Sequence, residues 1–474
     1  MLQRWALCCC DPNTRLRATG PGRHTDRMTI LTLPLPNPMA CAAPTWPWPT
    51  TPLTRRGAAA VCVVVIVSAC GGGGDATDPP EPAPVVSAPG AGASPAPAPG
   101  ATACDGAAGR VLDVGPGKPY ATPSAAAKVA QAGDVVRIAA GDYRGDVATW
   151  SASGLTICGV GGQARLFADG KSAGGKAIWV VSGANTTIDH VDFLNAKVPD
   201  NNGAGIRAEH KSGELRVLNS GFYDNQNGIL SAAGPITITI EGSEFARSDT
   251  GTTAALGHNL YIGRIDRLTV RRSFFHEAVR GHNLKSRAKV SVVDNSYFMD
   301  GPGGRSSYLT DFPDGGQVTL RGNLLHKGPL ADNPTAVAFG AESMSAWPTN
   351  TLELSHNTVV MTRSGGYFLR APAATQSLRL TANVWAGTGS PSLLTGGYAQ
   401  GNAVQTGNVS LQAAQFPGAS SLASPVFWPT AAALPALALS GVPDAAYTHD
   451  SPRPYALRAV APGARLAGAL QSAP

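Results

Sequence analysis

Three similar short sequence motifs, which we call words, contain the residues best suited to chemistry. They are residues 258–261, 282–287 and 307–311, which read HNLY, HNLKSR and SYLTD. The apolar letters recur while the polar letters change. Stacked repeats place such words side by side on one surface, where different polar side chains can act together.

Strand alternation sorts these words into an inner and an outer face. If Leu260, Leu284 and Leu309 point into a core, the polar neighbours point outward: Asn259, Tyr261, Asn283, Lys285, Arg287, Tyr308 and Thr310. The alternation predicts His258 and His282 at the start of this face, and Asp311 and Asp314 at its far end. Three turns span roughly 10 Å, about the footprint of a sugar or two.

Such a face suits β-elimination from a uronic-acid polysaccharide. The reaction needs a base for the proton at C5, a group that neutralises the adjacent carboxylate, and an acid for the leaving oxygen. Lys285 is the best candidate for the base, because Arg287 lies roughly 7 Å along the same face and a like charge favours a neutral amine.

The other two roles have several candidates. Arg287 could bind the substrate carboxylate, with Asn259 and Asn283 completing that site. The proton for the leaving oxygen could come from Tyr261, Tyr308 or His282. Asp311 and His258 are further candidates for binding the sugar.

Structural interpretations of the same residues remain open. Asn259 and Asn283 could form a buried ladder of side chains, and His258 and His282 could merely satisfy backbone groups at a corner. An outward Lys or Arg is usually a solvated charge, although only 14% of this chain is charged.

Two other classes of function compete with a lyase. A glycoside hydrolase needs two carboxylates roughly 5 to 9.5 Å apart. The acidic candidates do not fall in pairs on one strand face: Glu277, Asp300, Asp311 and Asp314. A non-catalytic glycan-binding protein is the third class, but aromatic residues make up only 6% of the chain and form no obvious outer stripe.

A longer repeat predicts the scaffold. The pattern apolar-x-apolar-x-x-(Asn or Ser)-x-(large apolar) recurs roughly every 22 to 34 residues, a period typical of solenoids. It ends at Phe222, Phe245, Phe275, Tyr297, Leu325, Val359 and Trp385. We expect Asn295, Asn323, Asn357 and Asn383 to form a structural ladder.

A second strand-like piece follows each repeat: 204–208, 227–231, 259–263, 283–288, 307–310, 335–340 and 367–371. Leucine-rich repeats would need a helix there and an upstream Leu that is usually missing. The sequence therefore predicts an all-β, right-handed parallel β-helix over residues 104–390, with C-terminal turns and an irregular cap over 391–474.

Several words resemble a known superfamily. Residues 114–117 (VGPG), 133–136 (GDVV) and 141–143 (GDY) resemble the first turn of secreted bacterial β-helix proteins of the pectate-lyase-like superfamily. Residues 202–207, 224–230, 281–288 and 313–316 look like a poorly characterised proteobacterial group within it. The resemblance covers roughly residues 110 to 390. It implies the fold more than the activity, because the superfamily includes lyases, hydrolases, epimerases and adhesins.

Lys285 and Arg287 are similar to the Lys and Arg pair of alginate and chondroitin lyases of polysaccharide lyase family six. In those enzymes the Arg comes from a later turn, so Arg287 is an imperfect match. Such relatives often use calcium to hold the carboxylate, which makes calcium a candidate cofactor. The sequence shows no acidic cage for it, and we assign no metal ligands.

The N-terminal region resembles a bacterial lipoprotein signal. Arg55 and Arg56 precede a short apolar run that ends at Cys70, the expected lipidation site, and a bilayer span would need roughly 20 residues. Met39 makes a more normal start than Met1, and an ordinary secretory signal is the alternative. We expect residues 1–69 to direct export and the Pro/Ala/Gly-rich residues 70–103 to link an outer-membrane lipid anchor to the β-helix.

Charge and cysteine content fit an exported protein. The first 69 residues carry seven Arg and two Asp of a chain whose net charge is +6, so the remainder is nearly neutral and no nucleic-acid partner is expected. We expect an acidic polysaccharide as the partner and a monomeric protein. Outside the export segment and Cys70, only Cys104 and Cys158 remain, and an oxidising compartment favours their pairing.

Overall fold

A computed structural model of the chain describes residues 101–253, 257–439, 447–449, 457–459 and 466–471. The predicted export segment 1–69, the lipidation site Cys70 and all but the last residues of the linker 70–103 lie outside the described residues. Within the described ranges, no helix has both the length and the apolar character needed to cross a membrane.

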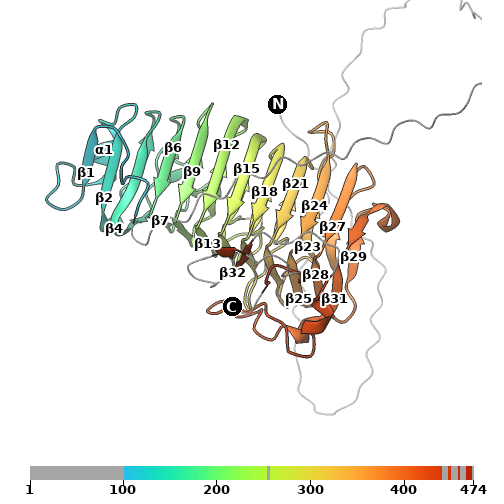
Figure 1. Cartoon of the computed structure of the whole chain (residues 1–474). Helices are drawn as coiled ribbons and strands as arrows, with labels where there is room; N and C mark the ends of the chain where they lie inside the picture. The colour runs from blue at the N-terminus through green and yellow to red at the C-terminus, as the bar shows by residue number, and fades with distance from the viewer. Residues whose placement is uncertain (1–100, 254–256, 440–446, 450–456, 460–465, 472–474) are drawn as a thin grey trace, which may run out of the picture. The chain divides into compact units, whose positions relative to one another are not determined.

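The described chain forms a parallel β-helix, in which successive turns stack as hydrogen-bonded parallel strands (Figure 1). One turn shows the plan: β17 (Leu284–Ser286), β18 (Val290–Asp294) and β19 (Tyr297–Met299) follow each other along the chain. Each then pairs in parallel with the corresponding strand of the next turn. The all-β parallel β-helix predicted from the repeats is confirmed.

Ten strands, one from each of ten successive turns, form the sheet that carries the three words. They are β3 (Ala148–Trp150), β5 (Ala177–Val181), β8 (Ala204–Ala208), β11 (Asn227–Ser231), β14 (Leu260–Ile262), β17, β20 (Thr310–Phe312), β23 (Thr335–Phe339), β26 (Tyr367–Arg370) and β29 (Ser392–Thr395). We refer to this ten-stranded sheet as the site sheet.

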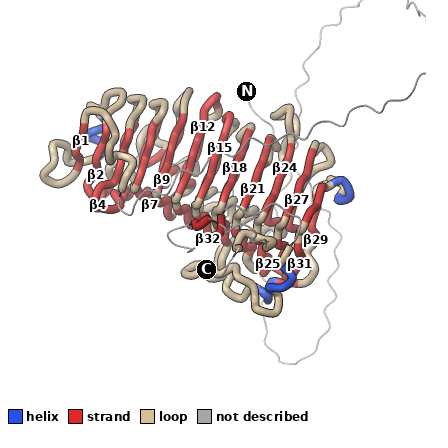
Figure 2. Tube along the Cα trace, in the orientation of Figure 1, coloured by secondary structure: helices blue, strands red, loops and turns tan. Residues whose placement is uncertain are grey.

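The remaining parallel strands form one large sheet that bends around the rest of each turn (Figure 2). Its first row is β1 (Val111–Val114), β2 (Val135–Arg144), β4 (Thr156–Phe167), β6 (Thr186–Asp189), β9 (Glu214–Leu218), β12 (Gly234–Glu241), β15 (Ile265–Arg271), β18, β21 (Gln317–Arg321), β24 (Thr351–Ser355), β27 (Ser377–Thr381) and β30 (Val404–Thr406). Its second row is β7 (Val191–Leu194), β10 (Gly221–Tyr223), β13 (Glu244–Ala246), β16 (Phe274–His276), β19, β22 (Leu324–Lys327), β25 (Thr358–Ser364), β28 (Val384–Thr388) and β31 (Val409–Gln412).

The third word is displaced from its predicted place. The sequence predicts a strand over 307–310, whereas β20 spans Thr310–Phe312. Phe312 is a fully buried core side chain, and alternation counted from it places Thr310 inward and Asp311 outward. The predicted outward position of Thr310 is therefore wrong.

A column of stacked aromatic rings fills the core between the sheets. Neighbouring ring centroids lie 4.4 to 5.0 Å apart from Phe193 through Phe222, Phe245 and Phe275 to Phe298. Phe298 takes the place predicted for Tyr297, because β16 pairs with β19 in a register that matches Phe275 with Phe298. Each added turn thus buries another ring against the previous one.

A ladder of Ser and Asn side chains follows one corner of the helix. In its Asn part, the Asn323 amide donates to Asn357, Asn357 donates to Asn383, and Asn383 donates to Asn408. The place predicted for Asn295 belongs to Ser296, whose backbone N–H donates to Asn323 at 2.9 Å. These side chains satisfy backbone groups that the bend leaves without strand partners.

Both ends of the described β-helix are covered. At the start, the short helix α1 (Pro123–Ala127) lies beside β1 and β3, and a disulfide joins Cys104 to Cys158. At the other end, a C-terminal segment lies against the second strand row (Figure 1) and contains two 3-10 turns, η2 (Ala413–Gln415) and η3 (Leu434–Leu437). Its Phe416, Phe427 and Leu437 pack against outward side chains of that row. A third 3-10 turn, η1 (Gln400–Asn402), and the hairpin β32 (Tyr447–His449) and β33 (Leu457–Ala459) complete the elements.

Candidate functional site

Strand register places three polar residues in one row on the outer face of the site sheet. Tyr261 in β14 pairs with Lys285 in β17, and Lys285 pairs with Asp311 in β20. The alignment of Tyr261 with Lys285 agrees with the prediction. In the third turn, the neighbour of Lys285 is Asp311 and not Tyr308, because β20 begins later than predicted.

Lys285 lies between two carboxylates. Its Nζ is 2.8 Å from Oε1 of Glu342 and 3.8 Å from Oδ2 of Asp311. The same Nζ lies 5.5 Å from the centroid of the Tyr261 ring. Lys285 is only 8% exposed, so it is far from the freely solvated charge of the alternative interpretation. The predicted base role depends on the positive charge of Arg287 nearby, whereas the charged groups in contact with Lys285 are two carboxylates.

Arg287 is held at four points. Its Nη1 donates to Oδ1 of Asp314 at 2.6 Å, its Nε donates to the Tyr261 hydroxyl at 3.2 Å, and its Nη2 donates to Glu342. The indole of Trp347 donates to the Arg287 carbonyl at 3.2 Å. Burial opposes the guanidinium charge, but the hydrogen bonds to Glu342 and Tyr261 outweigh it and raise the pKa of Arg287.

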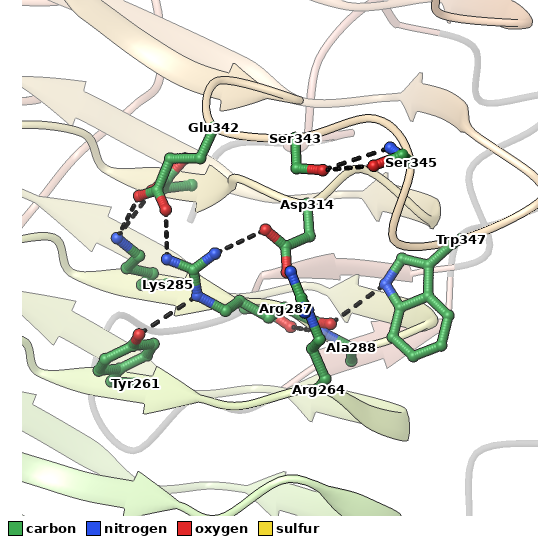
Figure 3. A network of polar contacts seen from close by, with 12 residues as sticks. Tyr261, Arg264, Lys285, Arg287, Ala288, Asp314, Glu342, Ser343, Ser345 and Trp347 are labelled. Atoms are coloured by element: carbon green, nitrogen blue, oxygen red, sulfur yellow. Dashed lines mark hydrogen bonds and ion pairs between the residues drawn. The ribbon is translucent and has the colours of Figure 1, made fainter. Parts of the chain in front are cut away.

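Glu342 joins the two cations. It belongs to the loop of residues 340–350 between β23 and β24, which we call the 340–350 loop. The Glu342 carboxylate accepts from Lys285 through Oε1 and from Arg287 through Oε2 (Figure 3). Burial opposes this charge, but the hydrogen bonds from both cations lower the pKa of the carboxyl group. Its side chain nevertheless stays 47% exposed.

The base of the 340–350 loop is well anchored. The backbone N–H groups of Glu342 and Ser343 both donate to the Pro313 carbonyl, at 3.0 and 2.9 Å. The Asn350 amide donates to the carbonyls of Met344 and Trp347, each at 3.0 Å, and its Oδ1 accepts from the backbone of Gly316. These bonds hold the loop backbone beside the row, while the Glu342 side chain projects over it.

Asp311 is an almost fully buried carboxyl group beside Lys285. Burial raises its pKa to about 7, although the positive charge of Lys285 opposes the rise. Its Oδ2 lies 3.5 Å from Nδ1 of His282, without hydrogen-bond geometry, and its Oδ1 has no hydrogen-bond partner among the described residues. A carboxyl group that titrates near neutral pH can accept or donate a proton there.

His258, His282 and Tyr308 form a separate column of stacked rings. The centroids of the two imidazoles are 4.8 Å apart, and Tyr308 lies 5.2 Å beyond His282. Burial lowers the pKa of His258 to about 3 and that of His282 well below its usual value. Both imidazoles are therefore neutral at pH 7, which disfavours His282 as the proton donor.

Tyr308 is also less suited to the acid role. Burial, and then the negative charge of Asp311, raise the pKa of its hydroxyl. Its ring continues the histidine column and does not lie in the row of Tyr261 and Lys285. Tyr261 is thus the predicted proton donor that lies directly beside the cationic pair.

The predicted outward position of Asn259 and Asn283 is wrong. Both are fully buried, and the Asn259 amide donates to Oδ1 of Asn283 at 2.7 Å and to the His276 carbonyl at 2.8 Å. The backbone of Ser248 donates to Oδ1 of Asn259. The corner before the site sheet leaves backbone groups unpaired, and the Asn259 amide satisfies several of them. They belong to a structural ladder and do not contact the outer face.

In the part of the chain that the structure describes, the carboxylates near Arg287 are already paired with cationic side chains. Asp314 is bound by Arg264 at 2.6 Å as well as by Arg287, and Glu342 is bound by Lys285 and Arg287. A calcium ion takes six to eight oxygen ligands, and carboxylates already paired with cationic side chains do not supply them. Among the described residues, no three His, Cys, Asp or Glu side chains group as a metal site would require.

Glu342 is the functional candidate that the sequence did not reveal. The 340–350 loop shares no repeated word with other turns, and no strand alternation places its side chains. The contact between Glu342 and Lys285 joins residues 57 positions apart, and that between Trp347 and Arg287 joins residues 60 apart. In the sequence, only an acidic residue, Glu342, and a nearby Trp347 distinguish the loop.

Comparison with known proteins gives similarity at the level of the fold. No family model matches the chain, and no curated protein matches its sequence. Three solved structures are similar. The pectate lyase Pel9A has 14% identity and a TM-score of 0.45, and the match covers 63% of this chain and 79% of that one. A rhamnogalacturonan lyase has 12% identity and a TM-score of 0.40, covering 63% and 87%. An alginate lyase from Paenibacillus sp. str. FPU-7 has 15% identity and a TM-score of 0.36, covering 64% and 99%.

Proposed function

We propose that this protein is a polysaccharide lyase that cleaves a uronic-acid polysaccharide by β-elimination. The observation that carries the proposal is the shared carboxylate of Glu342, which shows that Lys285 and Arg287 are spaced to hold one carboxylate between them. A Tyr hydroxyl and a carboxyl group that titrates near neutral pH lie within contact distance of the same pair.

Each step of the elimination has a candidate group. Arg287 neutralises the sugar carboxylate, which makes the proton at C5 more acidic. Lys285 must be a neutral amine to take that proton, and the neighbouring Asp311 carboxylate can take up the proton that Lys285 loses. The neutral amine still has N–H groups for the sugar carboxylate, and its lone pair takes the C5 proton. The electron pair of the C5–H bond forms the C4–C5 double bond, and the bond from C4 to O4 breaks. The Tyr261 hydroxyl, which accepts from Arg287 through its oxygen, gives its own proton to O4.

The decisive experiment is a substrate screen of the full-length protein. Alginate, pectate, glycosaminoglycans and bacterial exopolysaccharides would each be followed by absorbance near 235 nm and by reducing-end release. A lyase raises both signals, because elimination leaves an unsaturated uronate at each new end. Reducing ends without absorbance contradict the lyase, and binding without either signal indicates a non-catalytic glycan-binding protein.

One observation favours a glycoside hydrolase as the second candidate. Asp311 and Glu342 both contact Nζ of Lys285, and their surroundings shift the two pKa values in opposite directions. Paired carboxyl groups with separated pKa values are the usual acid and base of glycoside hydrolysis. The sequence did not place two carboxylates together, because Glu342 comes from a loop. We rank this candidate second, since Lys285 and Arg287 would then have no catalytic role.

We propose the cell envelope as the place of action. The lipoprotein-like signal before Cys70 supports an outer-membrane anchor, and the linker that follows would hold the β-helix away from the membrane. An acidic polysaccharide suits the cationic pair as a partner, and a monomer suffices because the row needs no second chain.

A further inference from the structure

The Glu342 carboxylate occupies the place that an acidic substrate needs. Its two oxygens accept from Lys285 and from Arg287, one cation each. A uronate carboxylate has the same two oxygens and the same charge, and would make the same two contacts. Both carboxylates cannot occupy this one place at once, because they would overlap and their like charges repel.

Both cations have partners other than Glu342. Arg287 bonds to Asp314 and to the Tyr261 hydroxyl, and neither bond involves Glu342. Lys285 has Asp311 at 3.8 Å as a second anionic neighbour. The carboxylate-binding geometry is therefore preorganised by residues on the strands and on the turn after β20.

Glu342 itself is the most replaceable part of the network. Its side chain is 47% exposed, whereas those of Asp311 and Asp314 are 2% and 1% exposed. Its backbone is fixed by the bonds of the 340–350 loop to Pro313, so the side chain can rotate away without moving the loop. Rotation into water leaves the carboxylate hydrated, and this hydration offsets part of the loss of its two ion pairs.

We infer that Glu342 is an internal competitor, which occupies the carboxylate-binding place of Lys285 and Arg287 until an acidic sugar displaces it. The identity of the displacing ligand, an acidic polysaccharide, rests on the proposed function. The apparent affinity for the sugar is then proportional to the fraction of molecules in which Glu342 is out of this place. Loss of this carboxylate strengthens binding.

The test is calorimetric binding of hexamers of galacturonate and of mannuronate at pH 7 to the full-length protein. A methyl-esterified galacturonate hexamer is the ligand control, because it lacks the carboxylate charge. The variants are Glu342→Gln, which keeps the shape but removes the charge, and Glu353→Gln, a matched change at an exposed position in β24. Thermal melting verifies that each variant is folded.

We expect Glu342→Gln to bind at least one acidic hexamer about tenfold more tightly than the wild type, and the esterified hexamer no more tightly. Glu353→Gln should match the wild type. The inference is overturned if Glu342→Gln binds neither acidic hexamer more tightly than the wild type does, including the case in which neither binds. Tighter binding without absorbance near 235 nm would support the competitor while contradicting the lyase.

Discussion

The Nζ of Lys285 lies 3.8 Å from Oδ2 of Asp311, on strands that pair in parallel with these two residues as partners. At this distance the two groups interact electrostatically without a direct hydrogen bond, and burial raises the pKa of Asp311 to about 7. The two residues therefore form one unit, in which the charge state of each influences the other.

Replacement of Lys285 should abolish turnover. We expect Lys285→Ala to reduce the rate of absorbance change near 235 nm by at least 100-fold on the polysaccharide identified in the screen, because general base catalysis contributes about this much or more. Lys289→Ala removes an exposed lysine four residues later and is the matched control. Full activity of Lys285→Ala would show that the site is assigned to the wrong residue.

The loss of Lys285 should leave the fold intact. The core is made by inward side chains such as Leu284 and Phe312, which this substitution does not touch. Asp311 can take up a proton when its cationic neighbour is absent, so no buried charge remains unpaired. We expect a decrease in melting temperature of only a few degrees, measured by circular dichroism.

Asp311 should make the protein less stable as the pH rises. The pKa of Asp311 is raised to about 7 from an ordinary value of 3.8, so the folded state binds the proton more tightly than the unfolded state. The contribution of the Asp311 proton to the free energy of unfolding is complete below pH 3.8, and it is lost as the pH rises to about 7. The slope is at most about 1.4 kcal/mol per pH unit.

Urea unfolding at several pH values between 4 and 8 tests this dependence. The free energy of unfolding of Asp311→Asn, relative to the wild type, should increase with pH, because Asn does not titrate. Parallel pH profiles for the two proteins would mean that Asp311 has an ordinary pKa in the folded protein.

The disulfide should stabilise the first turns. Cys104 and Cys158 are 54 residues apart, and closing such a loop is worth about 4 kcal/mol on the chain-entropy model. Reduction should lower the urea midpoint of the wild type. The double variant Cys104→Ala and Cys158→Ala should be insensitive to the reductant, and an equal effect of reductant on both proteins would argue against the bond.

Removal of Cys70 should release the protein from membranes. Cys70 lies outside the described residues, and the prediction follows from the lipoprotein-like signal before it. We expect Cys70→Ala to move the protein from the membrane fraction to the soluble exported fraction, as followed by immunoblotting. Continued membrane association of this variant would indicate another anchor.

Much of the scaffold was predictable from the sequence. The repeated apolar words predict the parallel β-helix, and strands β8 and β11 match the predicted pieces 204–208 and 227–231. The reason is local: alternation has a period of two, and each turn repeats the same burial pattern. The pairing of Tyr261 with Lys285 follows from the same pattern, because their two words are nearly identical.

Only the folded chain shows the composition of the site. The burial of Asn259 and Asn283 depends on where the corner falls, and the neighbour of Lys285 depends on where β20 begins. Glu342 reaches the row from a loop whose path is set by bonds to Pro313 and not by any repeat. Repeats therefore determine which turns stack, whereas irregular loops and shifts of register determine which charges meet.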